Sequence, residues 1–153
     1  MPNTQRFFIE IAYRGTAYHG WQTQPNALAV QAILDDKLSI VFRQIVETLG
    51  CGRTDAGVHA TQFFAHFDLE GVLEKDAINP NNLKSLNAIL PLDIVAKRII
   101  KVEPTAHARF DATLRAYEYH IHFSKDPFKT DNSWLLKEDS LDLEAMNQAA
   151  AII

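Results

Sequence analysis

Residues 52–60 read Gly52-Arg53-Thr54-Asp55-Ala56-Gly57-Val58-His59-Ala60, and the organisation of the chain follows from what flanks them. Residues 47–51 before them and residues 61–67 after them have the composition of β-strands, which predicts a loop held between two strands. Its glycines allow a left-handed backbone or a close approach to a ligand. Such a loop can present Asp55 to solvent, and a guanidinium at Arg53 favours the ionised carboxylate that a nucleophile needs.

Two elements are predicted before this loop. Residues 7–14 alternate between apolar and polar side chains, which is typical of a strand with one buried face. From Val30 to Phe42 apolar residues recur at helical spacing, which predicts an amphipathic helix lying on a sheet. Between them we expect Tyr18 and Trp21 to be buried as a lid on the core, although such side chains can also stack on bases.

Four elements are predicted after it. Asn79-Pro80 predicts the first turn of a helix with a leucine stripe. Residues 94–102 and 113–123 predict two strands, the second being the longest in the chain, and a helix is expected after Ser140 or Asp142. Alternation within residues 113–123 places Arg115, Tyr117 and Tyr119 on one face of the strand. We expect this face to lie partly in the core and partly in a cleft. This order of elements predicts an α+β domain with a mainly antiparallel sheet and helices packed on one face.

The composition is that of an ordinary globular domain. The chain has 153 residues, of which 47% are hydrophobic and 22% charged. No apolar run reaches the length of a membrane span, and the N-terminus lacks the order of a signal peptide. The single cysteine, Cys51, fits a reducing compartment, so we expect a cytoplasmic protein. A lone cysteine in a strand is more typically a small buried hydrophobe than a catalytic group.

Charge is unevenly distributed along the chain. The net charge of −4 argues against a protein that coats nucleic acid non-specifically. Residues 97–115 nevertheless hold five Lys and Arg against two acids, whereas acids gather in a connector over residues 68–76 and again in residues 138–144. A local basic cleft is compatible with this pattern, and so are two differently charged solvated faces.

Residue types alone leave the chemistry of the loop open. Asp55 is either a presented carboxylate or a turn former that bonds its own backbone. A phosphate cradle built on residues 50–57 fits neither the Walker loop nor the dinucleotide fingerprint. The six histidines include one His-x-His pair but no zinc-type spacing, so we predict no metal site.

Three motifs occur together in this chain. They are the Asp55 nonapeptide, Tyr18-His19-Gly20-Trp21-Gln22, and a segment with His107-Ala108-Arg109-Phe110 followed by Arg115-x-Tyr117-x-Tyr119. They resemble the catalytic loop, the Tyr-x-Gly-Trp-Gln segment and the Phe-His-Ala-Arg-Phe and Arg-x-Tyr-x-Tyr motifs of the tRNA pseudouridine synthase A family. Ala106 stands where the family has the first phenylalanine, and the resemblance covers essentially the whole chain.

This resemblance implies a role for four residues. Asp55 would be the catalytic residue, attacking either uracil C6 or the anomeric carbon of the ribose. Tyr117 would lie against the target base, Arg53 would hold a flanking phosphate or the vacated base site, and Arg109 would be a substrate-side arginine. The target uridine would be flipped out of its stack.

The resemblance also implies a setting for the reaction. The substrate would be tRNA, modified in the anticodon stem-loop, with no cofactor, and the full-length protein would be a homodimer. Residues 1–153 would form a single N-terminal catalytic half-domain, with the second half of the family fold absent from this chain. The alternative is a non-catalytic RNA-binding or assembly module in which the Asp55 loop is structural.

Overall fold

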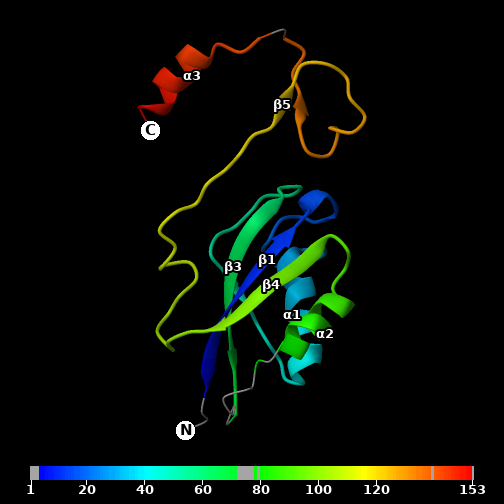
Figure 1. The fold of residues 1–153 in the computed structure, drawn as a ribbon, viewed down its shortest axis with the longest axis vertical. Helices are drawn as coiled ribbons and strands as arrows, with labels where there is room; N and C mark the ends of the chain where they lie inside the picture. The colour runs from blue at the N-terminus through cyan, green and yellow to red at the C-terminus, as the bar shows by residue number, and fades with distance from the viewer. Residues whose placement is uncertain (1–3, 72–77, 79, 139, 153) are drawn as a thin grey trace. The chain divides into compact units, whose positions relative to one another are not determined.

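The computed structural model describes residues 4–71, 78, 80–138 and 140–152. The chain divides into two compact units, Met1–Thr113 and Leu114–Ile153 (Figure 1). No helix in the described residues is long and apolar enough to cross a membrane.

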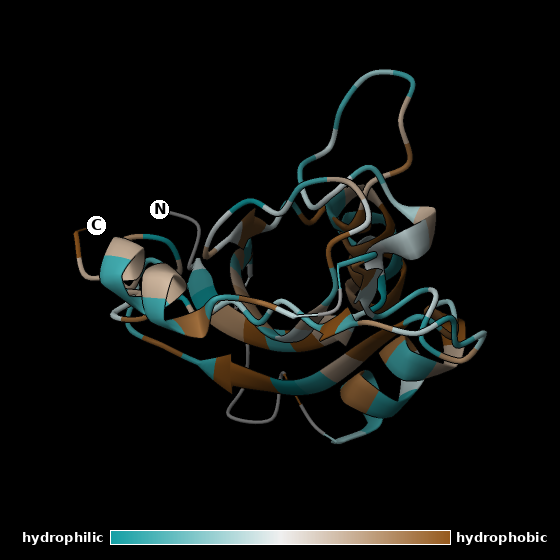
Figure 2. Cartoon of the chain, turned by 90° about the horizontal axis from the view of Figure 1, so that it is seen from above, coloured by the Kyte–Doolittle hydropathy of each residue, from teal (hydrophilic) through white to brown (hydrophobic). Residues whose placement is uncertain are grey.

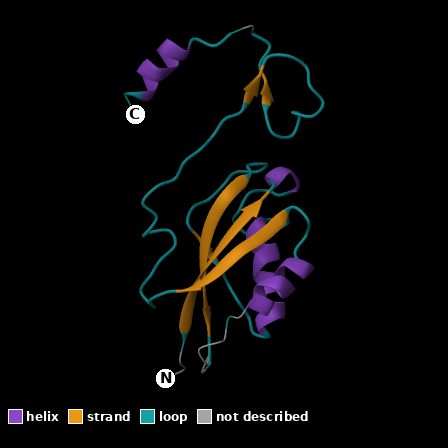
Figure 3. Cartoon of the chain, in the orientation of Figure 1, coloured by secondary structure: helices purple, strands orange, loops and turns teal. Residues whose placement is uncertain are grey.

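The first unit is built on a four-stranded antiparallel sheet with the strand order β2-β3-β1-β4. The strands are β1 (Gln5–Tyr13), β2 (Leu49–Gly50), β3 (Ala60–Leu69) and β4 (Ile94–Lys101). Helices α1 (Val30–Phe42) and α2 (Pro80–Ile89) cover the same face of this sheet, and a 3-10 turn, η1 (Gly15–Ala17), follows β1 (Figures 1 and 3). The predicted α+β fold with helices on one face is therefore confirmed.

The core lies between this sheet and its two helices. Alternate residues of β1 are buried, as the sequence predicts, and they are Phe7, Ile9, Ile11 and Tyr13. Leucines of the helices meet them, and Leu34, Leu38 and Leu86 are fully buried. Each such leucine contributes about 1.5–3 kcal/mol by leaving water, which fixes the helices on this face. The strands show corresponding hydrophobic stretches in Figure 2.

The opposite face of the sheet carries polar and aromatic side chains. In the strand register Phe8 lies beside His66, and Glu10 lies between Phe64 and Arg98. Glu10 is buried, and its carboxylate accepts hydrogen bonds from Gln62 and from Arg98. These two bonds hold the pKa of Glu10 below its ordinary value. Residues of this face also anchor the segment that contributes His107, Arg109 and Phe110 to the candidate site.

The second unit is small and mostly exposed. Strand β5 (Ile121–His122) pairs in parallel with β6 (Trp134–Leu135), and α3 (Leu143–Ala150) follows. As predicted, Asp142 caps this helix, accepting a hydrogen bond from the Ala145 N–H at 2.9 Å. Figure 2 shows that α3 carries both hydrophilic and hydrophobic residues.

The long strand predicted over residues 113–123 was wrong, because only Ile121–His122 forms a strand. The predicted half-buried face was wrong as well, since Tyr117 is 63% exposed and Tyr119 is 88% exposed. Side chains that alternate between two faces show that a segment could form a strand. The strand forms only where a neighbouring segment pairs with its backbone N–H and C=O groups. Among the described residues, β6 supplies a ladder partner for two residues alone.

The other predicted elements occur with small changes in their ends. Helix α1 has the predicted bounds, and α2 begins at Pro80, whereas Asn79 lies outside the described residues. The strand predicted over residues 47–51 is reduced to β2, and β3 extends to Leu69. The acidic connector therefore begins later than residue 68, and most of it lies outside the described residues.

Candidate active site

The Asp55 loop, residues 51–59, connects β2 to β3 as predicted. The Val58 N–H donates to the Asp55 carbonyl oxygen at 3.2 Å, and Gly57 has a φ of +81°, so the backbone turns tightly directly after Asp55. The Asp55 side chain is exposed and, within the described residues, makes no hydrogen bond or ion pair. The turn is thus closed by the backbone and not by the carboxylate.

The aromatic loop, residues 14–21, holds the Asp55 loop through backbone hydrogen bonds. The Trp21 N–H donates to the Thr54 carbonyl oxygen at 3.2 Å, and the Gly57 N–H donates to the Tyr18 carbonyl oxygen at 3.2 Å. These bonds lie on either side of the aspartate, so both halves of its loop are fixed. Two motifs that are distant in the sequence therefore form one structure.

Side chains at both ends of the Asp55 loop strengthen this attachment. The Thr54 hydroxyl lies 2.9 Å from the Tyr13 hydroxyl, within hydrogen-bonding distance. The His59 Nδ1 atom accepts a hydrogen bond from the Gly15 N–H at 2.9 Å. Because Tyr13 is the last residue of β1, the loop is tied to an inner strand of the sheet.

Close backbone contact accounts for two glycines of the aromatic loop. A Cβ atom on Gly20 would lie 2.2 Å from the Thr54 carbonyl oxygen, and one on Gly15 would lie 2.0 Å from the Val58 carbonyl oxygen. Gly20 also has a φ of +83°, a conformation that residues with a side chain rarely adopt. A side chain at either glycine would therefore displace the Asp55 loop.

Trp21 forms a wall of the core next to the loop, and it is 1% exposed. Its ring lies 4.4 Å from that of Phe63 between centroids, and a Cβ on Gly50 would lie 2.6 Å from its Nε1 atom. Tyr18 is also buried, and its hydroxyl donates to the Asp93 carboxylate at 2.6 Å. The prediction that both aromatics cover the core is confirmed.

Residues 106–111 run across the sheet face opposite the helices and are anchored there by Arg6. This arginine pairs with Asp68 at an N–O distance of 2.8 Å, and its Nη1 atom donates to the Ala106 carbonyl oxygen at 3.0 Å. The paired Asp68 carboxylate raises the pKa of Arg6, and Arg6 lowers that of Asp68. A charged pair on the sheet therefore holds the start of residues 106–111.

His66 of β3 supplies the second anchor. Its Nδ1 atom accepts a hydrogen bond from the Ala108 N–H at 3.1 Å, and its ring lies edge-on to that of His107 at 4.6 Å between centroids. Burial is the largest cause that lowers the pKa of His66, and Arg6 and His107 add to it. A lowered pKa favours the neutral ring, the form that can accept a hydrogen bond at Nδ1.

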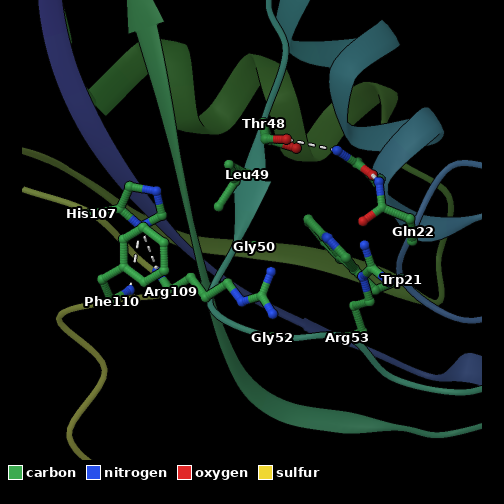
Figure 4. A pocket seen from close by; sticks show the side chains of 11 residues that line it. Trp21, Gln22, Thr48, Leu49, Gly50, Gly52, Arg53, His107, Arg109 and Phe110 are labelled. Carbon is green, nitrogen blue, oxygen red and sulfur yellow. Dashed lines mark hydrogen bonds between the residues drawn. The ribbon is translucent and has the colours of Figure 1, made fainter.

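Residues 107–111 form a closed turn, called here the Arg109 turn. The His107 N–H donates to the Asp111 carboxylate at 2.7 Å, and the Asp111 N–H returns a hydrogen bond to the His107 carbonyl oxygen at 2.9 Å. The His107 Nδ1 atom accepts from the N–H groups of Arg109 and Phe110 at 3.2 and 3.3 Å (Figure 4). The turn therefore has a fixed backbone although the side chains of Arg109, Phe110 and Asp111 are exposed.

The Arg109 turn, part of the Asp55 loop and β2 line one pocket of about 250 Å³ (Figure 4). Its lining residues are Trp21, Gln22, Gln31, Thr48, Leu49, Gly50, Gly52, Arg53, His107, Arg109 and Phe110. Gln31 of α1 holds one wall by donating to the Thr48 carbonyl oxygen at 2.7 Å. Two arginines at one pocket favour an anionic ligand such as a phosphate.

Of the four residues predicted to act in the site, the structure brings Arg53 and Arg109 together, and Asp55 lies outside the lining of their pocket. Arg53 and Arg109 line the same pocket, and Asp55 follows Arg53 by two residues in a loop whose conformation is fixed. Tyr117 belongs to the second unit, so its contact with a target base stays a prediction. Cys51 packs against the core, as expected of a small hydrophobe.

Two further residues of the pocket were not selected from the sequence. His107 and Phe110 belong to the same motif as Arg109, and this proximity in the sequence could have indicated that they line the pocket too. Their stacking on each other, at 4.1 Å between ring centroids, depends on the closed turn and is not visible in a list of residue types.

No protein-family model matches this sequence. Among curated proteins, the tRNA pseudouridine synthase A of Bacteroides thetaiotaomicron is 49% identical over 146 residues, 95% of this chain and 52% of that protein. The tRNA pseudouridine synthase A of Porphyromonas gingivalis is 47% identical over 148 residues, 97% of this chain and 58% of that protein. The chain is a half-length relative of the tRNA pseudouridine synthase A family.

A more distant tRNA pseudouridine synthase A, from Thermosipho africanus, is 42% identical over 97% of this chain and 60% of its own length. The chain thus spans about half the length of the tRNA pseudouridine synthase A proteins that it matches. The resemblance inferred from three short motifs extends over nearly all of its residues.

Proposed function

We propose that this chain carries the catalytic aspartate and part of the substrate site of a tRNA pseudouridine synthase, an isomerase. The observation that carries the proposal is the exposed Asp55 carboxylate on a loop held by backbone bonds on both sides. An adjacent pocket with Arg53 and Arg109 supports it, as do the names of the relatives. Fixing a reactive group in this way removes much of the entropic barrier to reaction.

The reaction needs one nucleophile and proton transfers. In one route the Asp55 carboxylate attacks the anomeric carbon as the bond to uracil N1 breaks, and N1 takes up the electron pair. After the base turns, C5 attacks the same carbon, the carboxylate leaves, and C5 loses its proton. In the other route the carboxylate adds to uracil C6 and opens the C5=C6 double bond, the bond between N1 and the anomeric carbon breaks, and C5 bonds to that carbon. Loss of the C5 proton then expels the carboxylate from C6 and restores the double bond. Neither route changes the net redox state, so no cofactor is required.

Charge in the pocket suits a nucleic-acid substrate. The Arg53 guanidinium would bind a phosphate next to the target or fill the space that the flipped base vacates, and Arg109 would contact the substrate from the same pocket. These contacts help to offset the few kcal/mol lost when the uridine leaves its stack. Tyr117 would lie against the flipped base and help to remove the C5 proton.

The setting of the reaction is part of the same proposal. The substrate is tRNA modified in the anticodon stem-loop, and the full-length protein is a cytoplasmic homodimer. Residues 1–153 act as the N-terminal catalytic half-domain, and a second half completes the cleft. The relatives' names support the choice of tRNA, and the half-length match supports the division into halves.

Nucleoside composition tests this proposal. Unmodified tRNA is incubated with the full-length protein, digested to nucleosides and analysed by chromatography for pseudouridine. We expect pseudouridine to form, and to be absent when the uridines of the anticodon stem-loop are replaced by cytidines. Binding of tRNA without any pseudouridine would favour the non-catalytic RNA-binding module instead.

A further inference from the structure

Phe110 is an exposed aromatic residue beside the candidate site. Its side chain is 77% exposed, and among the described Phe, Tyr and Trp residues of the first unit it alone is classed as exposed. It lines the pocket that also contains Arg53 and Arg109. An exposed aromatic ring that lines a pocket offers an apolar face on which a planar ligand can stack.

The Phe110 ring is held in place from behind. One face stacks on the His107 ring, at 4.1 Å between centroids and 22° between planes. His107 in turn contacts His66, which is buried in the sheet and stacks on Phe8 at 6.2 Å. A continuous column of rings therefore runs from β1 and β3 to Phe110 and leaves its other face exposed.

The backbone of the Arg109 turn fixes this arrangement further. The Phe110 N–H donates to the His107 Nδ1 atom at 3.3 Å, and the turn is closed by two hydrogen bonds between His107 and Asp111. A ring fixed in this way loses little conformational entropy when a planar ligand stacks on it.

The surroundings of the ring identify the chemistry of that ligand. An aromatic face beside two guanidinium groups is the combination that binds an unpaired nucleobase with its phosphates. A single peptide side chain would either cover the ring or pair with an arginine, whereas a nucleotide can do both at once.

We propose that the exposed face of Phe110 stacks on an unpaired nucleobase of the RNA substrate, next to the nucleotide that reacts. This inference rests on the proposed function for its substrate class. Stacking on any base is sequence-tolerant, so Phe110 contributes affinity and positioning rather than recognition of one base.

Substitution of Phe110 in the full-length protein tests the inference. Phe110→Leu keeps an apolar side chain and removes the aromatic face, whereas Phe110→Trp keeps the face. We expect the Kd for unmodified tRNA, measured by fluorescence anisotropy, to rise about 5-fold or more in Phe110→Leu and to stay near wild type in Phe110→Trp. The slope of binding against salt should not change, because the phosphate contacts are kept.

A matched control is Phe128→Leu, which removes a 92% exposed phenylalanine from the second unit. We expect it to bind tRNA as wild type does. Equal affinity of Phe110→Leu and wild type, or an equal loss in Phe128→Leu, would overturn the inference. These binding results hold whether or not the wild type forms pseudouridine, so a failure of the proposed reaction is seen separately in nucleoside analysis.

Discussion

Gly20→Ala is predicted to displace the Asp55 loop, because the new Cβ atom would lie 2.2 Å from the Thr54 carbonyl oxygen. That distance is about 1 Å shorter than an ordinary contact, and the atom it meets belongs to the backbone next to Asp55. The positive φ of Gly20 adds strain of about 1–2 kcal/mol. With about 1–3 kcal/mol for the overpacked contact, we expect a loss of about 2–5 kcal/mol in the free energy of unfolding.

Gly57→Ala is the matched control within the same structure. Gly57 has nearly the same φ, +81°, but a Cβ there would meet no atom within 4 Å. This variant should lose about 1–2 kcal/mol from backbone strain alone. Urea unfolding of both variants separates the contact from the strain.

The catalytic consequence of Gly20→Ala can be measured separately. A shift of about 1 Å in a catalytic group can lower kcat about 100-fold. We expect such a loss of kcat with tRNA binding largely kept, since Arg53 and Arg109 remain in the protein. Equal stability of the Gly20 and Gly57 variants, together with wild-type kcat in Gly20→Ala, would refute the view that close contact positions Asp55.

Three further predictions concern the elements that support the site. Burial raises the pKa of Asp35 to about 6, above its unfolded value, so its contribution to stability is present below pH 4 and is lost as the pH rises through 6. Thermal unfolding between pH 4 and pH 6 should therefore show that Asp35→Asn becomes more stable relative to wild type as the pH rises. A difference in stability that does not change with pH would contradict this. His66→Leu removes the acceptor for the Ala108 N–H, so stability should fall by about 1–2 kcal/mol and amide exchange in residues 107–111 should become faster; unchanged exchange would contradict the anchor. Arg6→Met leaves Asp68 and the Ala106 carbonyl without their partner, so it should accelerate exchange in the same residues and leave the exchange of α1 unchanged, whereas an equal effect on both would indicate a global loss of stability.

The sequence predicts correctly those helices and strands that bury one face of regularly spaced apolar residues. Helix α1 has its predicted bounds because its apolar residues recur at helical spacing, and β1 buries the four residues that alternation places together. Residues 113–123 show the limit of the same reasoning. Their alternation is as clear as that of β1, but a strand exists only where a neighbour completes its hydrogen bonds.

The candidate site is only partly visible in the sequence. Asp55, Arg53 and Arg109 were selected through short motifs, and the structure places their segments in one unit. The contacts that fix them depend on residues distant in the sequence, such as Gly20 against Thr54 and His66 against Ala108. Neither contact follows from residue type, since a glycine or a histidine has many possible roles.

Release of tritium from uracil C5 tests the central claim, that Asp55 is the nucleophile of a pseudouridine synthase. The full-length protein is incubated with unmodified tRNA labelled at C5, because this hydrogen must leave when C5 joins the ribose. Wild type and Asp36→Asn, which alters an exposed carboxylate on α1, should release tritium at equal rates. Asp55→Asn should bind tRNA and release none. Release by Asp55→Asn at the wild-type rate, or no release by any of the three, would contradict the account.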